Sequence, residues 1–140
     1  MCWERVVTIE DFYDGPRGGV AFLNGRLHVF ESVFDKARDE YSEEFNLTPI
    51  DEALLPLIEE KWKIWTRWAT AYHAGKTSSD TNPALPADRP RHDELKATLD
   101  PLLVTDSAKA VRRLGEFRDV DIMGSDHDAE VRWSLSKDQK

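Results

Sequence analysis

The sequence of 140 residues contains a single cysteine, Cys2. One thiol cannot form a disulfide within the chain or supply the paired cysteines of a structural zinc site, so neither a disulfide-linked secreted scaffold nor a zinc finger is expected. Long apolar runs are also missing: no stretch reaches the length of about 18 residues that crosses a bilayer, and no apolar signal region follows the charged N-terminus. These absences predict a cytoplasmic protein without a membrane partner.

Internal repeats and low-complexity tracts are absent, and 40% of the residues are hydrophobic, which is typical of a compact soluble protein. A domain of about 150 residues buries roughly 68 to 70% of the surface that its unfolded chain exposes, so one core can form without a structural metal. We therefore expect a single domain over residues 1–140, with a flexible tail at 136–140 and no metal or cofactor.

Positive charge is scarce. The chain has 19 Lys and Arg against 27 Asp and Glu, a formal net charge of −8, and a field of this sign repels phosphate backbones. Nucleic acid is therefore a disfavoured partner. It stays as a third hypothesis because basic residues accompany Trp133, where they could flank a stacking platform for single strands. These residues are Lys109, Arg112, Arg113, Arg118 and Arg132.

The negative charge is concentrated in one stretch. Between Asp35 and Glu60 there are nine acids and two bases, which accounts for −7 of the −8. The leading hypothesis is a non-catalytic interaction domain, such as an inhibitor or an immunity-like protein, whose acidic surface docks on a basic protein. The alternative is a solvated face that aids solubility. The predicted partner-binding residues are Asp39, Glu40, Glu43, Glu44, Asp51 and Glu52.

The GxSxG, GxGxxG and GxxxxGK[ST] motifs of hydrolases and phosphate-binding loops are absent. None of the four histidines is paired with another at the i, i+4 spacing that places two imidazoles on one helix face for zinc. His73, His92 and His127 still support a second functional hypothesis, a small metal-dependent hydrolase or other enzyme in which one of them works with a nearby Asp or Glu. That site would require these side chains to converge in a pocket.

The N-terminal third favours strands. Alternating residues from Trp3 to Ile9 predict the first strand, and Asn24-Gly25 predicts a two-residue hairpin between the next two. With Leu23 facing Arg26, one side of this hairpin is expected to form the core, and it comprises Val20, Phe22, Leu27 and Val29.

The turn formers at 14–19 predict a change of chain direction before that hairpin. Arg17 stands there beside glycine backbone donors, so the segment is a possible anion-binding loop. The alternative is a plain turn.

The middle of the chain favours helices. Thr48 is the predicted N-cap of a long amphipathic helix, with Pro49 at its first position and its end near Gly75. Pro56 is expected to kink this helix or to separate a short first helix from the main one. A loop is expected over residues 76–91, followed by a second helix over 92–103.

Trp62, Trp65 and Trp68 share one flank of the long helix. We expect them to pack the helix on the sheet, although exposed indoles would instead form a peptide-binding strip. Lys61 falls in the same apolar stripe, where its ammonium group needs a carboxylate partner or must reach water along its stem.

The C-terminal third is ambiguous at 107–115, where a helix and a strand both fit. We favour a strand over 111–120 that pairs with 130–135 across a turn at 123–128.

Together these elements predict an α+β domain. Its expected architecture is a curved antiparallel sheet or partial small barrel, with three N-terminal strands at about 3–34 and a C-terminal hairpin at about 111–135. A helical insertion at about 48–103 would separate the two groups of strands.

Overall fold

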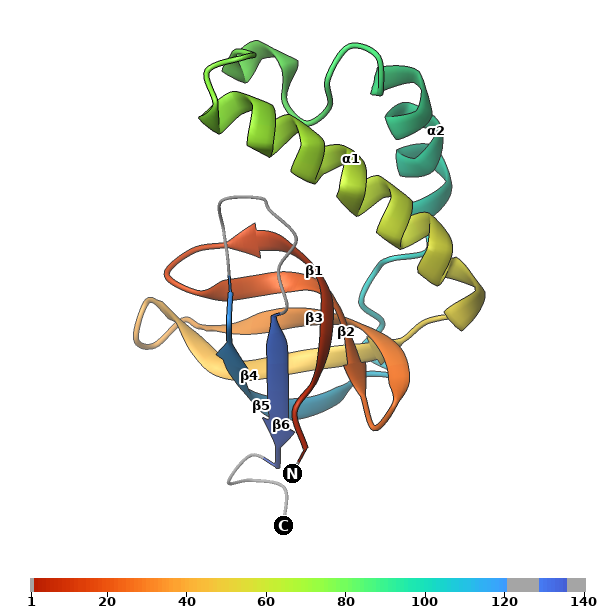
Figure 1. Ribbon diagram of the computed structural model, residues 1–140. Coiled ribbons are helices and arrows are strands. Elements are labelled where there is room, and N and C mark those ends of the chain that lie inside the picture. Colours follow the sequence, from red (N-terminus) through yellow and green to blue (C-terminus); the bar gives the residue numbers. More distant parts are fainter. Residues whose placement is uncertain (1, 121–128, 136–140) are drawn as a thin grey trace.

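A computed structural model describes residues 2–120 and 129–135. Six antiparallel strands form a closed barrel in chain order, and two α-helices are inserted between the fourth and fifth strands (Figure 1). The strands are β1 (Glu4–Phe12), β2 (Pro16–Leu23), β3 (Arg26–Asp35), β4 (Glu40–Pro49), β5 (Val111–Arg118) and β6 (Glu130–Ser134). The helices are α1 (Leu55–His73) and α2 (Arg89–Leu99), with short 3-10 turns η1 (Glu52–Leu54) and η2 (Ser79–Thr81).

The α+β prediction is confirmed, but the barrel is more closed than the partial barrel expected. The acidic segment supplies the missing strand, β4, which pairs with β3 on one side and β5 on the other. Phe45 and Leu47 alternate with polar residues and are buried in the core at 2% and 0% exposure. The acidic side chains obscured this period of two in the sequence.

The Asn24-Gly25 hairpin is confirmed with the predicted register, in which Leu23 faces Arg26. Both sides of the hairpin are buried. Val20 and Val29 belong to a core beneath the helices, whereas Ala21 and Phe30 belong to the core inside the barrel. The predicted core-facing side of the hairpin therefore corresponds to only one of the two hydrophobic cores, the one beneath the helices.

Aromatic side chains fill the inside of the barrel. The ring centroids of Phe30, Phe45, Phe117 and Trp133 lie 5.6 to 6.0 Å apart, mostly in tilted or edge-on arrangements that suit aromatic quadrupoles. The Trp133 indole donates its Nε1 hydrogen to the Phe22 carbonyl oxygen at 2.9 Å, so its one polar atom is satisfied.

The predicted start of the long helix is wrong. Thr48 is the buried penultimate residue of β4, where its hydroxyl accepts from the Asp106 backbone N–H, and α1 begins seven residues later. Asp51 instead caps η1 by accepting from the Ala53 N–H at 2.9 Å. Pro56 therefore falls in the first turn of α1, where its missing donor breaks no helical hydrogen bond. The end near Gly75, which has φ +73°, is confirmed.

The second helix also lies earlier than predicted. Pro90 is accommodated in the first turn of α2, and the helix ends before Pro101 rather than running to residue 103. The predicted loop at 76–91 contains η2 and the start of α2. Within the described residues, no helix combines the length and apolarity needed to cross a membrane.

The strand prediction for the C-terminal third is confirmed. β5 and β6 pair antiparallel, with Leu114 facing Ser134 and Arg118 facing Glu130. β6 also pairs with β1, which closes the barrel. The predicted turn at 123–128 and the predicted tail at 136–140 lie outside the described residues.

Candidate functional site

Two bidentate ion pairs join α1 to α2 and its N-cap residue. Arg91 donates to both carboxylate oxygens of Glu60 at 2.6 and 2.7 Å, and Arg67 donates to both of Asp88 at 3.0 and 2.9 Å. The hydrogen bonds from these guanidinium groups lower the pKa values of Glu60 and Asp88 below their ordinary range. The pairs lie on exposed surface, while Ile58 and Ile64 of α1 and Leu95 and Leu99 of α2 share one buried hydrophobic cluster beneath them.

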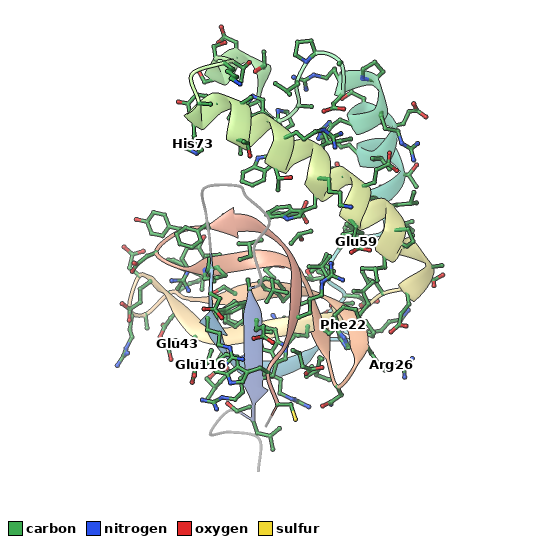
Figure 2. The ribbon with its side chains drawn as sticks, viewed as in Figure 1. Phe22, Arg26, Glu43, Glu59, His73 and Glu116 are labelled. Carbon is green, nitrogen blue, oxygen red and sulfur yellow. The ribbon has the colours of Figure 1, made fainter. Side chains whose placement is uncertain are left out.

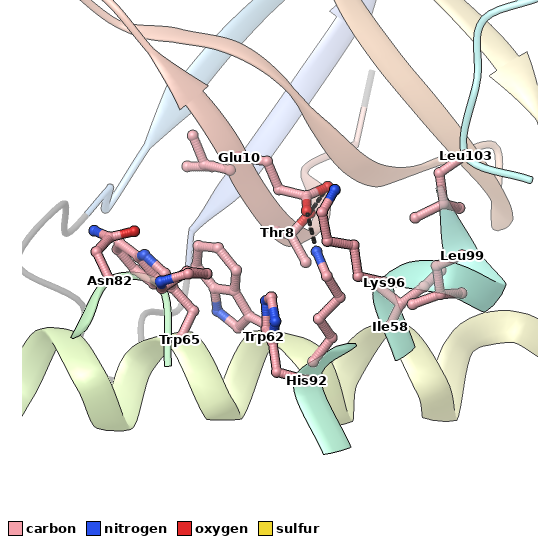
Figure 3. Close-up of a pocket in the computed structure, with 13 residues that line it drawn as sticks. Thr8, Glu10, Ile58, Trp62, Trp65, Asn82, His92, Lys96, Leu99 and Leu103 are labelled. Atoms are coloured by element: carbon pink, nitrogen blue, oxygen red, sulfur yellow. Dashed lines mark hydrogen bonds and ion pairs between the residues drawn. The ribbon is translucent and has the colours of Figure 1, made fainter. Parts of the chain in front are cut away.

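A cavity of about 330 Å³ remains where this helix pair meets β1 (Figure 3). Ile58 and Leu99, which belong to the core beneath the helices, form one wall of the cavity. Residues of β1 form the facing wall: Thr8, Ile9 and Glu10. Between Val6 and Thr8 the β1–β2 register shifts, and the Thr8 hydroxyl accepts from the Val20 N–H at 3.1 Å. This irregularity fixes the part of β1 that faces the cavity.

Two tryptophans form an aromatic wall of the cavity. The half-buried rings of Trp62 and Trp65 stack with centroids 4.9 Å apart and planes at 24°. Trp68 behaves differently, because it is 6% exposed, stacks on Tyr72 and donates its indole N–H to Thr81 at 2.8 Å. The core prediction therefore holds for Trp68, whereas Trp62 and Trp65 lie between the two alternatives, at the edge of a cavity.

Charged groups stand beside these rings. The Lys61 side chain is 20% exposed, and its ammonium nitrogen lies 3.4 Å from a Glu10 carboxylate oxygen, so of the two expected alternatives the structure shows the carboxylate partner. Lys96 also lines the cavity and forms an i, i+4 ion pair with Asp100, which raises the pKa of the lysine. Two cations and one carboxylate therefore line a cavity in a protein whose net charge is −8.

His92 is a buried polar residue of the cavity wall. The residue is 4% exposed, and its Nδ1 lies 3.4 Å from the Asp93 carboxylate, a long contact. Across residues 2–120 and 129–135, no hydrogen-bond partner is found for its other ring nitrogen, Nε2.

A second concave surface lies at one end of the barrel, where the β1–β2 turn meets the β3–β4 hairpin. We call it the barrel-end groove. It has a volume of about 690 Å³ and is lined by Asp11, Phe12, Tyr13, Asp14, Arg17, Phe34, Asp39, Glu40 and Tyr41. Phe12, Tyr13 and Phe34 are 44%, 70% and 43% exposed, so large aromatic side chains gather here in contact with water.

These aromatic side chains contact one another across the two hairpins. The Tyr41 ring lies 6.0 Å from that of Tyr13 and 5.1 Å from that of Phe34. The Arg17 guanidinium sits 5.0 Å from the Tyr41 centroid and donates to the carbonyl oxygens of Tyr13 at 2.7 Å and Asp14 at 2.8 Å. These contacts favour a role for Arg17 in bracing the turn over the predicted role in binding an anion.

Four carboxylates and one guanidinium line the barrel-end groove, a formal charge of −3. Asp14 and Asp39 adopt left-handed backbone conformations with φ +54° and +53°, which hold each at a turn. Arg38 lies 3.7 Å from Glu40, but the two side chains are 75% and 59% exposed, so this pair is weak and readily exchanged for another partner.

The structure divides the six acids predicted to bind a partner. Asp39 and Glu40 line the barrel-end groove, whereas Asp51 and Glu52 follow the other end of β4, about 30 Å away along a ten-residue strand. Glu52 there accepts from the Leu27 backbone N–H at 3.2 Å.

The other predicted acids stand outside the barrel-end groove. Glu44 lies 3.6 Å from an Arg112 nitrogen, and Glu43 is exposed on β4. The six acids therefore do not form one surface. Sequence reasoning missed Asp11 to Asp14, whose signal was two aromatic residues flanked by aspartates beside turn glycines.

The histidines of the hydrolase hypothesis are not gathered by the described structure. His73 is exposed at the C-terminal end of α1 (Figure 2), while His92 is buried in α2 and lines the cavity. His127 lies outside the described residues. Among the residues described, no three His, Cys, Asp or Glu side chains lie close enough together to hold a metal ion.

The basic residues near Trp133 are largely engaged with acids. Arg118 pairs with Glu130 at 2.7 Å and Arg132 with Glu116 at 2.8 Å, and both guanidinium groups also lie over the Trp3 ring. This surface of β5 and β6 is therefore charge-balanced, which gives little attraction for a phosphate backbone.

Comparison with known proteins gives no further guide to the site. No protein-family model matches the chain, and no significant match is found among curated proteins or solved structures.

Proposed function

We propose that this protein is a non-catalytic interaction domain whose barrel-end groove binds a basic segment of a partner protein. The proposal depends on one observation: four carboxylates surround a group of exposed aromatic side chains in this groove. An exposed aromatic patch of this kind is typical of an interaction surface. The leading sequence hypothesis is thereby narrowed from a whole acidic stretch to one groove.

The chemistry of the groove suits arginine and lysine side chains. Aromatic faces attract cations within about 6 Å of the ring centroid, and the chain's own Arg17 already occupies such a position over Tyr41. Carboxylates at the rim, such as Asp14 and Asp39, would steer a basic segment toward the rings and raise its association rate. An acidic or neutral segment would meet the same rings but gain no attraction from the rim.

The groove is also held in shape before binding. The Arg17 guanidinium donates hydrogen bonds to two carbonyl oxygens within the β1–β2 turn, those of Tyr13 and Asp14. It also donates to the Ser42 carbonyl oxygen of β4 at 3.4 Å. Less ordering on binding means that more of the interaction energy appears as affinity. A protein that masks a basic surface, as an inhibitor or immunity-like factor does, would use such a groove, and we place this role in the cytoplasm, consistent with the exposed free thiol of Cys2.

The proposal can be tested by isothermal titration calorimetry with a ten-residue peptide of alternating arginine and serine. We expect Asp14→Asn combined with Asp39→Asn to weaken binding about tenfold, because each lost exposed charge pair should reduce the binding free energy by about 0.7 kcal/mol. Asparagine tolerates the left-handed backbone at both positions, so the fold should be unaffected. Glu43→Gln removes one charge from the exposed surface of the same sheet, outside the groove, and should leave the affinity nearly unchanged.

Binding should also weaken as salt is raised, and a peptide of alternating glutamate and serine should not bind. Equal affinities for the double variant and the unmodified protein would contradict the proposal, as would binding of the glutamate peptide.

A further inference from the structure

We propose that the cavity between α1, α2 and β1 is a binding site for a small planar aromatic carboxylate. This site is separate from the barrel-end groove, and the two share no lining residue. Its volume of about 330 Å³ falls at the lower end of the range for small-molecule sites. Such sites combine apolar walls with a few convergent polar groups, and this cavity has both.

The aromatic wall explains why the ligand would be planar. Trp62 and Trp65 are already stacked and line the cavity while remaining half-buried. A flat aromatic ring placed against the Trp65 ring extends the stack in the offset arrangement that indoles favour. An aliphatic ligand of equal size would gain burial but not this geometry.

The charges explain why the ligand would be an anion. Lys61 is four-fifths buried at its side chain, and its contact with Glu10 at 3.4 Å is long for a charge-assisted hydrogen bond. Lys96 lines the same cavity but pairs with Asp100, so Lys61 is the cavity cation whose contact with a carboxylate is incomplete. A ligand carboxylate near Lys61 would complete the hydrogen bonding of this ammonium group, whereas a ligand ammonium group would be repelled by it.

His92 supplies an independent sign of a missing partner. Its side chain is 5% exposed and lines the cavity, yet its Nε2 has no hydrogen-bond partner among the residues that the structure describes. A buried polar atom without a partner is costly, and a ligand oxygen in the cavity would accept a hydrogen bond from an Nε2–H group. Aromatic stacking, a largely buried ammonium group with a long carboxylate contact and an open imidazole nitrogen thus converge on one cavity.

Isothermal titration calorimetry with four probes separates these requirements. The probes are 2-naphthoate, its neutral alcohol 2-naphthalenemethanol, its amine 2-naphthylmethylamine, and the non-aromatic cyclohexanecarboxylate. We expect 2-naphthoate to bind at least tenfold more tightly than each of the others, because only it carries both the flat ring and the negative charge. No detectable binding of 2-naphthoate, or equal binding of the amine, would overturn the proposal.

Variants then locate the binding. Lys61→Gln should weaken 2-naphthoate at least fivefold, while Lys63→Gln, which removes the same charge from an exposed position on the same helix, should not. Trp65→Leu should weaken the binding of 2-naphthoate while changing the affinity of cyclohexanecarboxylate little. Thermal melts confirm that each variant is folded. Equal effects of the Lys61 and Lys63 substitutions would show that the anion binds elsewhere and would refute the site.

Discussion

The indole ring of Trp133 lies against the α-carbon of Gly115 so closely that a methyl group at residue 115 would come within 2.7 Å of its Cζ3 atom. The same methyl group would meet the Phe45 ring at 3.0 Å. Glycine is therefore required on this part of β5 because the two aromatic side chains use the space of a side chain inside the barrel.

Gly115→Ala should destabilise the protein by about 1 to 3 kcal/mol, because a well-packed core must shift its rings to admit one carbon. Urea unfolding followed by tryptophan fluorescence measures this change. Gly18→Ala is the matched control, since a methyl group there meets its nearest atoms at 3.4 and 3.7 Å, an ordinary contact. A loss for Gly115→Ala no larger than for Gly18→Ala would contradict the packing described here.

The hydrogen bond from Trp68 to Thr81 ties α1 to the segment that leads to α2. Thr81→Val keeps the shape of the side chain but leaves the indole N–H, in a residue that is 6% exposed, without its acceptor. We expect a loss of about 1 to 3 kcal/mol in the free energy of unfolding. Thr70→Val, at an exposed position of α1, should lower the free energy of unfolding far less. Near-ultraviolet circular dichroism should report the altered environment of Trp68.

The Arg67–Asp88 ion pair should make stability depend on pH in the acid range. The pKa of Asp88 is lowered by the hydrogen bond from Arg67, so the stabilisation is fully present above the ordinary aspartate pKa of about 3.9 and is lost as pH falls through the lowered value. At pH 7 the free energy of unfolding of the unmodified protein should exceed that of the Asp88→Asn variant by about 1 kcal/mol or less. This difference should vanish in acid, as measured by thermal melts from pH 7 to pH 2. A difference that persists at pH 2 would argue against the ion pair as its cause.

The left-handed backbone of Asp39 sets the turn of the β3–β4 hairpin. Asp39→Ala should cost about 1 kcal/mol because alanine lacks the short polar side chain that lets aspartate and asparagine adopt φ +53° by local hydrogen bonding, and Asp39→Asn should cost almost nothing. Chemical denaturation of the two variants measures the difference. Equal stabilities would show that the turn relaxes to another conformation.

Local features were readable from the sequence where neighbours along the chain decide the structure. Asn24-Gly25 predicted its hairpin and register because both turn positions require positive φ. The alternation in β5 and β6 likewise predicted their pairing. The start of α1 was misplaced because Thr48 and Pro49 resemble a helix N-terminus, whereas pairing with β3 holds them in a strand.

What the sequence alone determined was therefore the α+β class, the local hairpins and the concentration of acids. Only the tertiary structure decided that β4 closes a barrel, because its pairing with β5 joins residues such as Phe45 and Arg113 that are far apart in the chain. The same holds for both candidate sites. The barrel-end groove combines two separate turns, and the cavity combines β1 with two helices, so their chemistry depends on long-range packing that no local pattern encodes.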